Sequence, residues 1–343
     1  MRDSKLLGAT LERFPRAEIG HLPTPLEAMP NLGRELRLSL FVKRDDCTGI
    51  AFGGNKVRQL EYYLGAAQAV NANLLLITGA VQSNFVRTAA AMGRRLGMEC
   101  HIQLEERVPD ISALHRTNGN VLLDRLLGAT LHSYPEGEDE AGADAEIERI
   151  ADKLREDGQR PYVIPLGANS APLGALGYVR AAIEVLPQIH AVGGIDEIVV
   201  ASGSALTHAG LLLGLRLLGD KTVVRGVCVR RNATQQSARV LQRVAATAAL
   251  LGVDDQVVAP KDVYLTDATL GPGYGQLTIL TRGAIVRTAR AEGLFLDPVY
   301  TGKVMADLIA KAQENERSGK RVLFWHTGGQ PALFGYADQL LPD

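Results

Sequence analysis

Short apolar runs recur along the chain, and longer segments with polar residues at helical spacing separate them. The runs cover 39–43, 73–78, 99–105, 129–134, 161–165, 197–201, 223–229 and 322–326. Each run is apolar nearly throughout and does not alternate apolar with polar residues. Such continuous runs are typical of strands that helices cover on both faces. The pattern therefore predicts an α/β fold with mostly parallel sheets.

Two of the intervening segments have clear helical periodicity. Residues 83–97 place Val86, Ala90 and Leu96 on one face and arginines on another, as expected of a helix that connects two parallel strands. Residues 135–160 are the most charged stretch, with apolar side chains at helical spacing in the second half. We interpret this stretch as a flexible loop and a helix with a solvated face, and not as an acidic binding site.

The chain has 343 residues, of which 46% are hydrophobic, and this is enough for more than one hydrophobic core. We expect two domains. No long linker, internal repeat or low-complexity tract divides the sequence. The two domains should therefore be intertwined along the chain and not follow one another end to end.

The charge balance excludes some classes of partner. Lys and Arg number 37 against 38 Asp and Glu, so no overall charge draws the protein to nucleic acid or a membrane surface. No stretch is apolar enough to span a bilayer, and the first residues lack the apolar centre of a signal peptide. We expect a cytoplasmic protein with neither a nucleic-acid nor a membrane partner.

The cysteines and histidines do not suggest a metal centre. Cys47, Cys100 and Cys228 are too few and too far apart for a disulfide framework or a zinc site. The seven histidines are dispersed, and no two stand at i, i+4 beside a carboxylate. We interpret the cysteines as reduced, structural thiols and expect no metal.

One lysine stands at an unusual place, in the sequence AFGGNKVRQLEYY at 51–63. Asn55 is a suitable N-cap residue, which places Lys56 in the first turn of the predicted helix. The positive end of the helix dipole disfavours a cation there, so the free amine, which can form a Schiff base, becomes easier to generate. The alternative is a surface lysine that pairs with Glu61 or with solvent.

A second feature suggests a phosphate site. A strand that ends at Ala201 and a helix from about His208 enclose a loop of mostly small residues: Ser202, Gly203, Ser204, Ala205, Leu206 and Thr207. Small residues leave N–H groups accessible, and a helix N-terminus favours a phosphate dianion. A reactive lysine together with a phosphate cradle is what pyridoxal phosphate requires. No G-x-G-x-x-G follows a strand, which makes a dinucleotide the weaker candidate.

Two glycine- and proline-containing loops carry tyrosines. Tyr274 stands between glycines in LGPGYGQLT, and Tyr300 follows a proline in LDPVYTGK. A single tyrosine in such a loop is often a packed ring with a satisfied hydroxyl. A pair is more suggestive, because a phenol can donate to a carboxylate or transfer a proton.

Several motifs together resemble one family. They are KRDDCTGIAFGGNKVRQLE, GAVQSNFVRTAAA, TNGNVLLDRLLGA, ALGYV, VVASGSALTHAG, GPGYG, LDPVYTGK and HTGGQPALFGY. In this order, from about residue 14 to 336, they are similar to the pyridoxal-phosphate enzymes that include D-cysteine desulfhydrase and 1-aminocyclopropane-1-carboxylate deaminase.

The resemblance implies a fold of the tryptophan-synthase β type, called fold type II. This fold has two open, twisted, mostly parallel sheets with helices on both faces, and a small domain inserted in a larger one. The large, cofactor-binding domain would comprise 1–54 and 166–343, and the small domain 55–165. The resemblance also implies pyridoxal 5'-phosphate in the cleft, a small amino-acid substrate and a homodimer.

It further implies roles for single residues. Lys56 would hold the cofactor as a Schiff base, and Asn84 would face its ring hydroxyl. Ser83 would contact the substrate carboxylate or assist proton transfer, while the loop 202–207 would bind phosphate. Two tyrosines would line the substrate side of the ring: Tyr274 and Tyr300.

Thr301 and Thr327 bear on the reaction. The cyclopropane deaminases of this family carry a glutamate and a leucine at the matching positions, whereas threonines are expected in the D-cysteine desulfhydrases. A hydroxyl beside the pyridine nitrogen is a milder partner than a carboxylate, and suffices where a good leaving group departs from Cβ. The resemblance thus implies β-elimination on D-cysteine or a close β-substituted alanine, giving sulfide, pyruvate and ammonia. Lys56 is the natural base, with Ser83 or a tyrosine on the other face.

The chain departs from the family pattern at a few positions. Phe85 stands where histidine or glutamine is expected and Thr88 where glutamine is expected, Leu206 replaces a small residue, and a proline after GYGQLT is missing. Phe85 is next to the expected carboxylate site and could reshape it. Alternatives are an L-cysteate sulfo-lyase, a 1-aminocyclopropane-1-carboxylate deaminase, and a regulatory protein that binds cofactor or amino acid without turnover.

Overall fold

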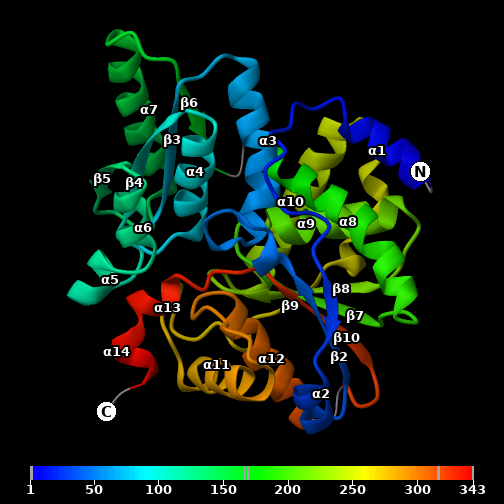
Figure 1. Ribbon diagram of the computed structural model, residues 1–343. Helices are drawn as coiled ribbons and strands as arrows, with labels where there is room; N and C mark the ends of the chain where they lie inside the picture. Colours follow the sequence, from blue (N-terminus) through cyan, green and yellow to red (C-terminus); the bar gives the residue numbers. More distant parts are fainter. Residues whose placement is uncertain (1–2, 166, 168–169, 315–316, 342–343) are drawn as a thin grey trace.

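Two β-sheets organise the computed structural model, which describes residues 3–165, 167, 170–314 and 317–341 (Figure 1). The strands are β1 (Leu26–Ala28), β2 (Ser39–Arg44), β3 (Leu74–Ala80), β4 (Glu99–Glu105), β5 (Thr130–Tyr134), β6 (Pro161–Ile164), β7 (Glu197–Ser202), β8 (Val223–Cys228), β9 (Tyr264–Thr266) and β10 (Arg321–His326). One sheet is six-stranded, in the order β1-β2-β10-β7-β8-β9, and the other is four-stranded, in the order β5-β4-β3-β6. Among the strand pairs that the structure describes, only β1–β2 is antiparallel.

Helices fill most of the connections between these strands. They are α1 (Ser4–Leu11), α2 (Pro30–Leu36), α3 (Asn55–Ala69), α4 (Asn84–Arg95), α5 (Ala113–Thr117), α6 (Asn120–Leu126), α7 (Glu140–Glu156), α8 (Leu173–Ala191), α9 (Leu206–Leu217), α10 (Ala233–Leu251), α11 (Ile279–Glu292), α12 (Thr301–Gln313), α13 (Ala332–Gly335) and α14 (Ala337–Leu340). Short 3-10 turns cover Asp45–Cys47, Ile50–Phe52, Asp255–Val257 and Pro260–Asp262. The predicted α/β fold is confirmed. The strands that the pattern missed, β1 and β9, have three residues each and lie at the sheet edges.

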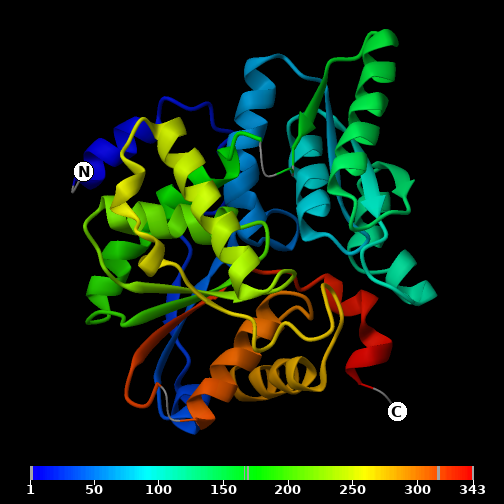
Figure 2. The same ribbon diagram turned by 180° about the vertical axis from the view of Figure 1, so that it is seen from behind.

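Helices cover both faces of the six-stranded sheet. Ile198 and Val200 of β7 pack with α1, α8, α9 and α10. Their neighbours in the strand, Val199 and Ala201, point to the other face and pack with α2, α11 and α12. Because both faces are buried, every position of β7 is shielded from water, which explains its continuous apolar run. Figure 2 shows the sheet between these two helical layers.

The four-stranded sheet is built in the same way. Leu75 and Ile77 of β3 pack with α3 and α4, whereas Leu74 and Leu76 pack with Ile147 on α7. In Figure 1, α7 lies at the upper left, on the face of the four-stranded sheet that points away from α3. All strands of this sheet lie between 74 and 164, and those of the larger sheet lie outside that range. This division agrees with an inserted domain, and the boundaries at 54 and 165 stay a prediction.

A buried ionic network ties α3 to the larger sheet. Asp45 accepts hydrogen bonds from Arg58 of α3, from Tyr178 of α8 and from Trp325 of β10. Arg58 also binds Glu184 of α8. The start of α3 is therefore fixed by charged groups that are almost completely shielded from water.

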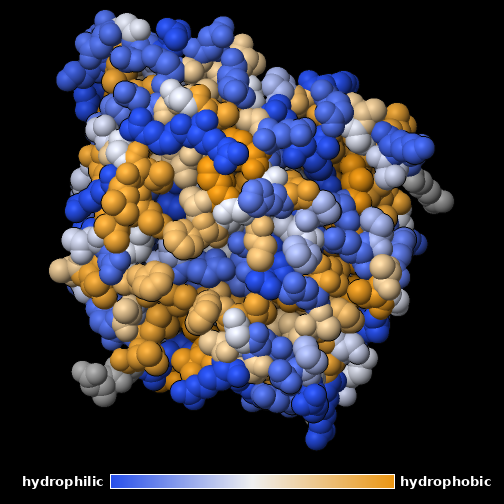
Figure 3. Space-filling view, in the orientation of Figure 1, coloured by the Kyte–Doolittle hydropathy of each residue, from blue (hydrophilic) through white to orange (hydrophobic). Residues whose placement is uncertain are grey.

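The surface is polar over α7 and more apolar elsewhere. Figure 3 shows hydrophilic side chains at the top, and apolar ones gathered at the lower left, where Figure 1 has α11 and α13. Exposed apolar side chains of these helices are Ile279, Leu280 and Phe334. Within the described part of the chain, no helix is both long and apolar enough to cross a membrane.

Candidate active site

The carboxyl ends of strands from both sheets meet at one large cavity. Its lining includes residues 78–80 of β3, Glu105 at the end of β4, Gly203 after β7 and Arg230 after β8. Loops that follow parallel strands are the usual place for ligands in open α/β sheets. Counted together with the open solvent at its mouth, the cavity has a volume of about 910 Å³.

Lys56 lies in the first turn of α3, as predicted, although the cap is different. The helix begins at Asn55 and its N-cap residue is Gly54, at φ 113°. Asn55 is therefore not the N-cap, and its amide donates instead to the hydroxyl of Thr207 at 2.9 Å. Gly53 must be a glycine, because a Cβ there would lie 2.2 Å from the carbonyl oxygen of Asp46. This tight turn aims the start of α3 at the cavity.

The amine of Lys56 has no carboxylate partner among the described residues. Its nitrogen lies 3.4 Å from the side-chain oxygen of Gln59. Glu61, the alternative partner, instead binds Arg16 and the backbone N–H groups of 19 and 20. Burial lowers the pKa of Lys56 to about 8. The surface interpretation is thus wrong, and desolvation makes the free amine accessible.

A smaller cavity adjoins Lys56 and gathers most of the residues expected to hold a cofactor. Its lining is Asn55, Lys56, Asn84, Ala201, Gly203, Ser204, Ala205, Thr207, Tyr300, Thr327 and Gly328. Ala205 is the N-cap of α9 and adopts the left-handed conformation at φ 71°. A turn of this kind at a helix N-terminus directs backbone N–H groups at an anion. The cradle and the amine beside it fit pyridoxal phosphate.

Three details of the predicted phosphate loop are different. The helix begins at Leu206 and not at His208. Ser202 is the last residue of β7, and its hydroxyl is bonded to His208 and Gln236 beneath the loop, so it does not line the smaller cavity. Leu206 lines the larger cavity. Thr207 accepts hydrogen bonds from α3, which leaves its own proton for a phosphate oxygen.

Ser83 and Asn84 stand at the start of α4. Ser83 is its N-cap, with an oxygen that accepts from the N–H groups of 85 and 86, and it lines the larger cavity. Its hydroxyl proton remains available as a donor. The side-chain oxygen of Asn84 accepts from Asn120 at 3.0 Å, which leaves the amide N–H groups for a cofactor oxygen in the smaller cavity.

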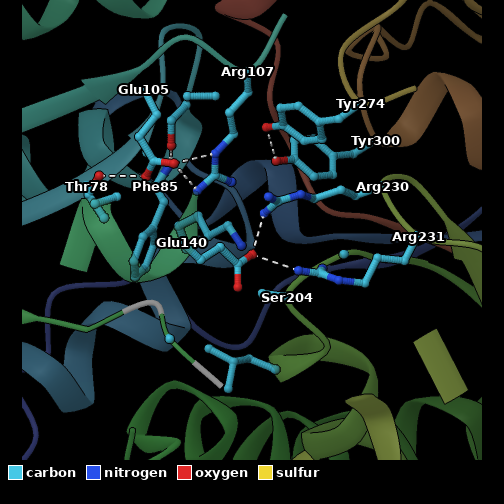
Figure 4. Close-up of a pocket in the computed structure, with 18 of the residues that line it drawn as sticks. Thr78, Phe85, Glu105, Arg107, Glu140, Ser204, Arg230, Arg231, Tyr274 and Tyr300 are labelled. Carbon is cyan, nitrogen blue, oxygen red and sulfur yellow. Dashed lines mark hydrogen bonds and ion pairs between the residues drawn. The ribbon is translucent and has the colours of Figure 1, made fainter. Parts of the chain in front are cut away.

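The two tyrosines form a pair on the cavity wall. Their hydroxyl oxygens lie 2.7 Å apart, and Figure 4 shows the two hydroxyl groups pointing toward each other. Burial raises the pKa of Tyr274 and raises that of Tyr300 well above the ordinary value, so both phenols are neutral in the physiological range. The pairing that the two loops suggested is present in the fold.

Thr301 and Thr327 occupy different surroundings. Thr327 lines the smaller cavity. Thr301 lines neither cavity, because its hydroxyl is turned away and donates to Asp297 at 2.6 Å in a buried cap at the start of α12. Thr301 therefore supports the neighbouring Tyr300 and does not contact the cofactor space, contrary to the sequence prediction.

The cavity also contains a charged group that the sequence interpretation missed. Glu140, in the stretch interpreted as a solvated helix face, lines the cavity and binds Arg230 and Arg231, each at 2.7 Å (Figure 4). Arg107 reaches the same space from the end of β4 and pairs with Glu105. The sequence did contain one indication of this charged group. Arg107 and Arg230 each follow the end of a predicted strand by two residues or fewer, and ligands of open α/β sheets lie at those ends.

Comparison with known proteins agrees with this site. The family model of the pyridoxal-phosphate dependent enzymes matches residues 17–328. A D-cysteine desulfhydrase of Salmonella typhi is 42% identical over 327 residues, 95% of this chain and 97% of the relative. The D-cysteine desulfhydrase of Salmonella choleraesuis strain SC-B67 has the same identity and coverage.

Solved structures give the same picture. The crystal structure of an ACC deaminase homologue matches with a TM-score of 0.86 and 36% identity, over 97% of this chain and 98% of its own. An O-ureido-L-serine synthase, 17% identical, shares the fold at a TM-score of 0.65 over 97% of this chain and 96% of its own. The resemblance seen in the motifs and the fold type it implies are thus confirmed, and the chain belongs to the family of pyridoxal-phosphate dependent enzymes.

Proposed function

We propose that the protein catalyses β-elimination on D-cysteine or a close β-substituted alanine, giving sulfide, pyruvate and ammonia. The observation that carries the proposal is the position of Lys56, whose readily deprotonated amine lies between the phosphate cradle and the wall with Ser83 and the tyrosine pair. The relatives named D-cysteine desulfhydrase, at 42% identity, support the choice of substrate.

When bound, pyridoxal phosphate supplies an electron sink for the electrons released at the substrate α-carbon. The residues of the chain supply the rest. The Lys56 amine has a pKa lowered to about 8, so it is mostly uncharged at a pH above that value and can then accept the α-proton. Ser83 can donate a hydrogen bond to the substrate carboxylate, and the neutral phenols of Tyr274 and Tyr300 can hold or pass a proton on the cavity wall.

The smaller cavity supports elimination over opening of a cyclopropane ring. No Asp or Glu of the described residues lines it, whereas Thr327 does. Without a carboxylate beside the ring nitrogen the electron sink is milder, which suffices when sulfide leaves from the neighbouring carbon. We therefore expect no turnover of 1-aminocyclopropane-1-carboxylate.

The direct test compares the purified wild type with Lys56→Ala. The visible absorbance of bound cofactor is recorded, D-cysteine is added, and sulfide and pyruvate are measured in the same sample. Cofactor absorbance and both products only with the wild type would support the proposal. Bound cofactor without turnover of any small amino acid would favour a regulatory binding protein instead.

We also propose that the protein is a homodimer. The exposed apolar side chains Ile279 and Phe334, of which 80% and 60% are accessible, would lose water on association. Light scattering on a size-exclusion column gives the mass directly. A mass near that of the 36.8 kDa chain itself would contradict the proposal.

We further propose a cytoplasmic location. Cys47, Cys100 and Cys228 are all free thiols in the structure. Free thiols persist in reducing compartments, and oxidising compartments favour disulfides. Cell fractionation followed by immunoblotting tests this proposal, and recovery in a secreted or periplasmic fraction would contradict it.

A further inference from the structure

Asn120 is the first residue of α6, and it is completely buried. It belongs to the motif TNGN at 117–120, which the proposed function leaves without a role. Its side-chain oxygen accepts a hydrogen bond from Nε of Arg87 at 3.0 Å. Its side-chain nitrogen donates to the backbone oxygen of Gln82 at 3.1 Å and to Oδ1 of Asn84 at 3.0 Å. Both ends of this amide are thus bonded inside the protein.

The orientation of the Asn120 amide cannot be reversed. A guanidinium group only donates hydrogen bonds, and a backbone carbonyl oxygen only accepts them. Burial lowers the pKa of Arg87 to about 10, so this side chain is a cation at neutral pH. If the amide turned by 180°, its nitrogen would face Arg87, its oxygen would face the carbonyl of Gln82, and both buried hydrogen bonds would be lost.

The orientation of Asn84 follows from that of Asn120. Asn84 is the first residue of α4 and lines the smaller cavity. Its Oδ1 accepts from the nitrogen of Asn120 and, at 3.4 Å, from Nη2 of Arg87. Both partners present only donors at this point, so Asn84 must turn its oxygen toward them and its amide N–H groups toward the cavity. Without these partners, an asparagine offers either atom to a ligand.

Arg87 has no bonded carboxylate to compensate its charge among the described residues. Its remaining hydrogen bonds go to the backbone oxygens of Ala51 and Gly53, in the turn before α3. Asp124 acts on Arg87 by its charge, but both of its oxygens are buried without a hydrogen-bond partner. Burial raises the pKa of Asp124 to about 8, so this carboxyl group is mostly neutral at pH 7. A buried guanidinium with neutral partners lowers stability, and functional sites are where such groups are retained.

We propose that Asn120 and Arg87 are positioning residues that direct the amide N–H groups of Asn84 at the ring hydroxyl oxygen of the cofactor. This inference rests on the cofactor site of the proposed function and holds for any substrate. An N–H donor stabilises the cofactor form in which the ring oxygen is ionised, whereas an amide oxygen in the same place would repel it. The direction of the Asn84 amide therefore decides whether this contact strengthens or weakens cofactor binding.

The decisive variant is Asn120→Asp, because a carboxylate still accepts from Arg87 but cannot donate to Asn84. The Asn84 amide should then turn its nitrogen toward the new carboxylate and its oxygen toward the cavity. The apoenzyme is titrated with pyridoxal phosphate, and the bound cofactor is measured by its absorbance, with no substrate present. We expect the dissociation constant to rise roughly 10- to 100-fold, as for the loss of a hydrogen bond to a charged group.

A double-mutant cycle shows whether Asn120 acts through Asn84. Asn84→Ala removes the donor itself and should weaken cofactor binding about tenfold. In that background, Asn120→Asp should change the dissociation constant by less than about threefold, because no amide is left to turn. An equal fold-change in both backgrounds would overturn the inference, since the added negative charge would then act on the cofactor directly.

Asn118→Asp is the matched control. It introduces the same charge two residues away and keeps the side-chain oxygen that accepts from the N–H group of 119. Its cofactor affinity should stay within about threefold of the wild type. Urea unfolding of the apoproteins shows whether each variant is folded. If Asn120→Asp does not fold, Asn120→Ala takes its place in the cycle, and its effect should likewise disappear in the Asn84→Ala background.

The spectrum of the bound cofactor gives a second readout, which a purely structural role would not change. The visible share of the absorbance should fall in Asn120→Asp and not in Asn118→Asp, because a cofactor with a neutral ring oxygen absorbs at shorter wavelength. Wild-type affinity and spectrum in Asn120→Asp would overturn this inference and leave the proposed function intact. A wild-type protein that binds no cofactor would instead contradict the proposed function itself.

Discussion

The side-chain nitrogen of Lys56 lies 5.5 Å from the centre of the Phe85 ring. Phe85 is buried and packs edge-on against Tyr63, so its ring is held in place. It stands where the family pattern has histidine or glutamine, and its effect is to replace a polar neighbour of the amine by an apolar wall. An aromatic ring therefore stands beside the reactive lysine where the family pattern has a polar group.

Phe85→Gln should raise the pKa of Lys56 from about 8 toward the ordinary lysine value, because a polar group then solvates the ammonium form. Only the uncharged amine attacks the cofactor aldehyde. Loading of the apoenzyme near neutral pH should slow about tenfold for each unit by which the pKa rises.

The measurement is the rate at which visible absorbance appears when cofactor is added to apoenzyme, at a series of pH values. Phe85→Leu is the matched control, since it keeps the wall apolar and should leave the pH dependence in place. Identical profiles for the Gln variant and the wild type would show that Phe85 does not desolvate Lys56.

Lys56→Met should stabilise the apoenzyme at neutral pH. The pKa of Lys56 is lowered from 10.5 to about 8, so below pH 8 the folded protein holds a penalised ammonium group. The penalty disappears as pH rises from about 8 to 10.5, where the unfolded chain binds more protons than the folded one. The gain is at most about 3 kcal/mol at neutral pH and vanishes in alkali. Urea unfolding of the wild-type and Lys56→Met apoproteins, at neutral pH and again in alkali, measures this gain in the free energy of unfolding. A gain of the same size at both pH values would show that the buried ammonium group is not its cause.

Much of the fold could be predicted from the sequence, because both sheets are buried on both faces. Continuous apolar runs such as those of β3 and β7 have that cause, and β4 was predicted at Glu99–Glu105 as observed. The edge strands β1 and β9 could not be found, since three residues with exposed positions leave no periodic signal.

The residues of the candidate site also fall into those that local sequence predicts and those that it does not. Lys56 and the loop before α9 are local features, each readable from a glycine-rich or small-residue stretch at a helix start. The contact between Glu140, at the start of α7, and Arg230, after β8, joins positions 90 residues apart that belong to the layers of different sheets. Such a pair depends on how the sheets face each other, which no local pattern contains. Thr301 was misplaced because the motif names the residue but not the direction of its hydroxyl.

Thr327→Val and Thr301→Val should affect different properties, the first cofactor binding and the second stability. Thr327 lines the smaller cavity, so its variant should weaken cofactor binding about tenfold while the apoenzyme keeps its stability. Thr301 is the first residue of α12 and is bonded to the buried Asp297, so its variant should lower the free energy of unfolding by about 1 to 2 kcal/mol. Cofactor titration and urea unfolding of both variants give the comparison. Weaker cofactor binding by the Thr301 variant alone would restore the original prediction.

Tyr300→Phe should lower kcat on the preferred substrate by about 100-fold while cofactor absorbance is retained. The hydroxyl that is lost is the partner of Tyr274 at 2.7 Å. The pKa values of both phenols are raised, so neither phenol ionises near neutral pH. A fall in kcat of the wild type just above neutral pH should therefore have another cause than the ionisation of these tyrosines. Steady-state rates across pH check both statements, and an alkaline limb that disappears in the variant would assign that ionisation to the pair.

Arg58→Met should be the most destabilising of these changes, because it removes the cation that binds both Asp45 and Glu184 and leaves Lys43, which is bonded to Glu184, as their remaining cationic neighbour. Breaking a buried ion pair in this way costs about 3 to 5 kcal/mol. Although burial opposes their ionisation, Arg58 holds the pKa values of both carboxyls below their ordinary range. Their stabilisation is therefore complete above about pH 4 to 5 and is lost as pH falls through the lowered values. Urea unfolding should show a smaller loss on acidification in the variant than in the wild type. The surface variant Arg149→Gln should match the wild type, and an equal acid dependence in all three proteins would contradict the role given to this network.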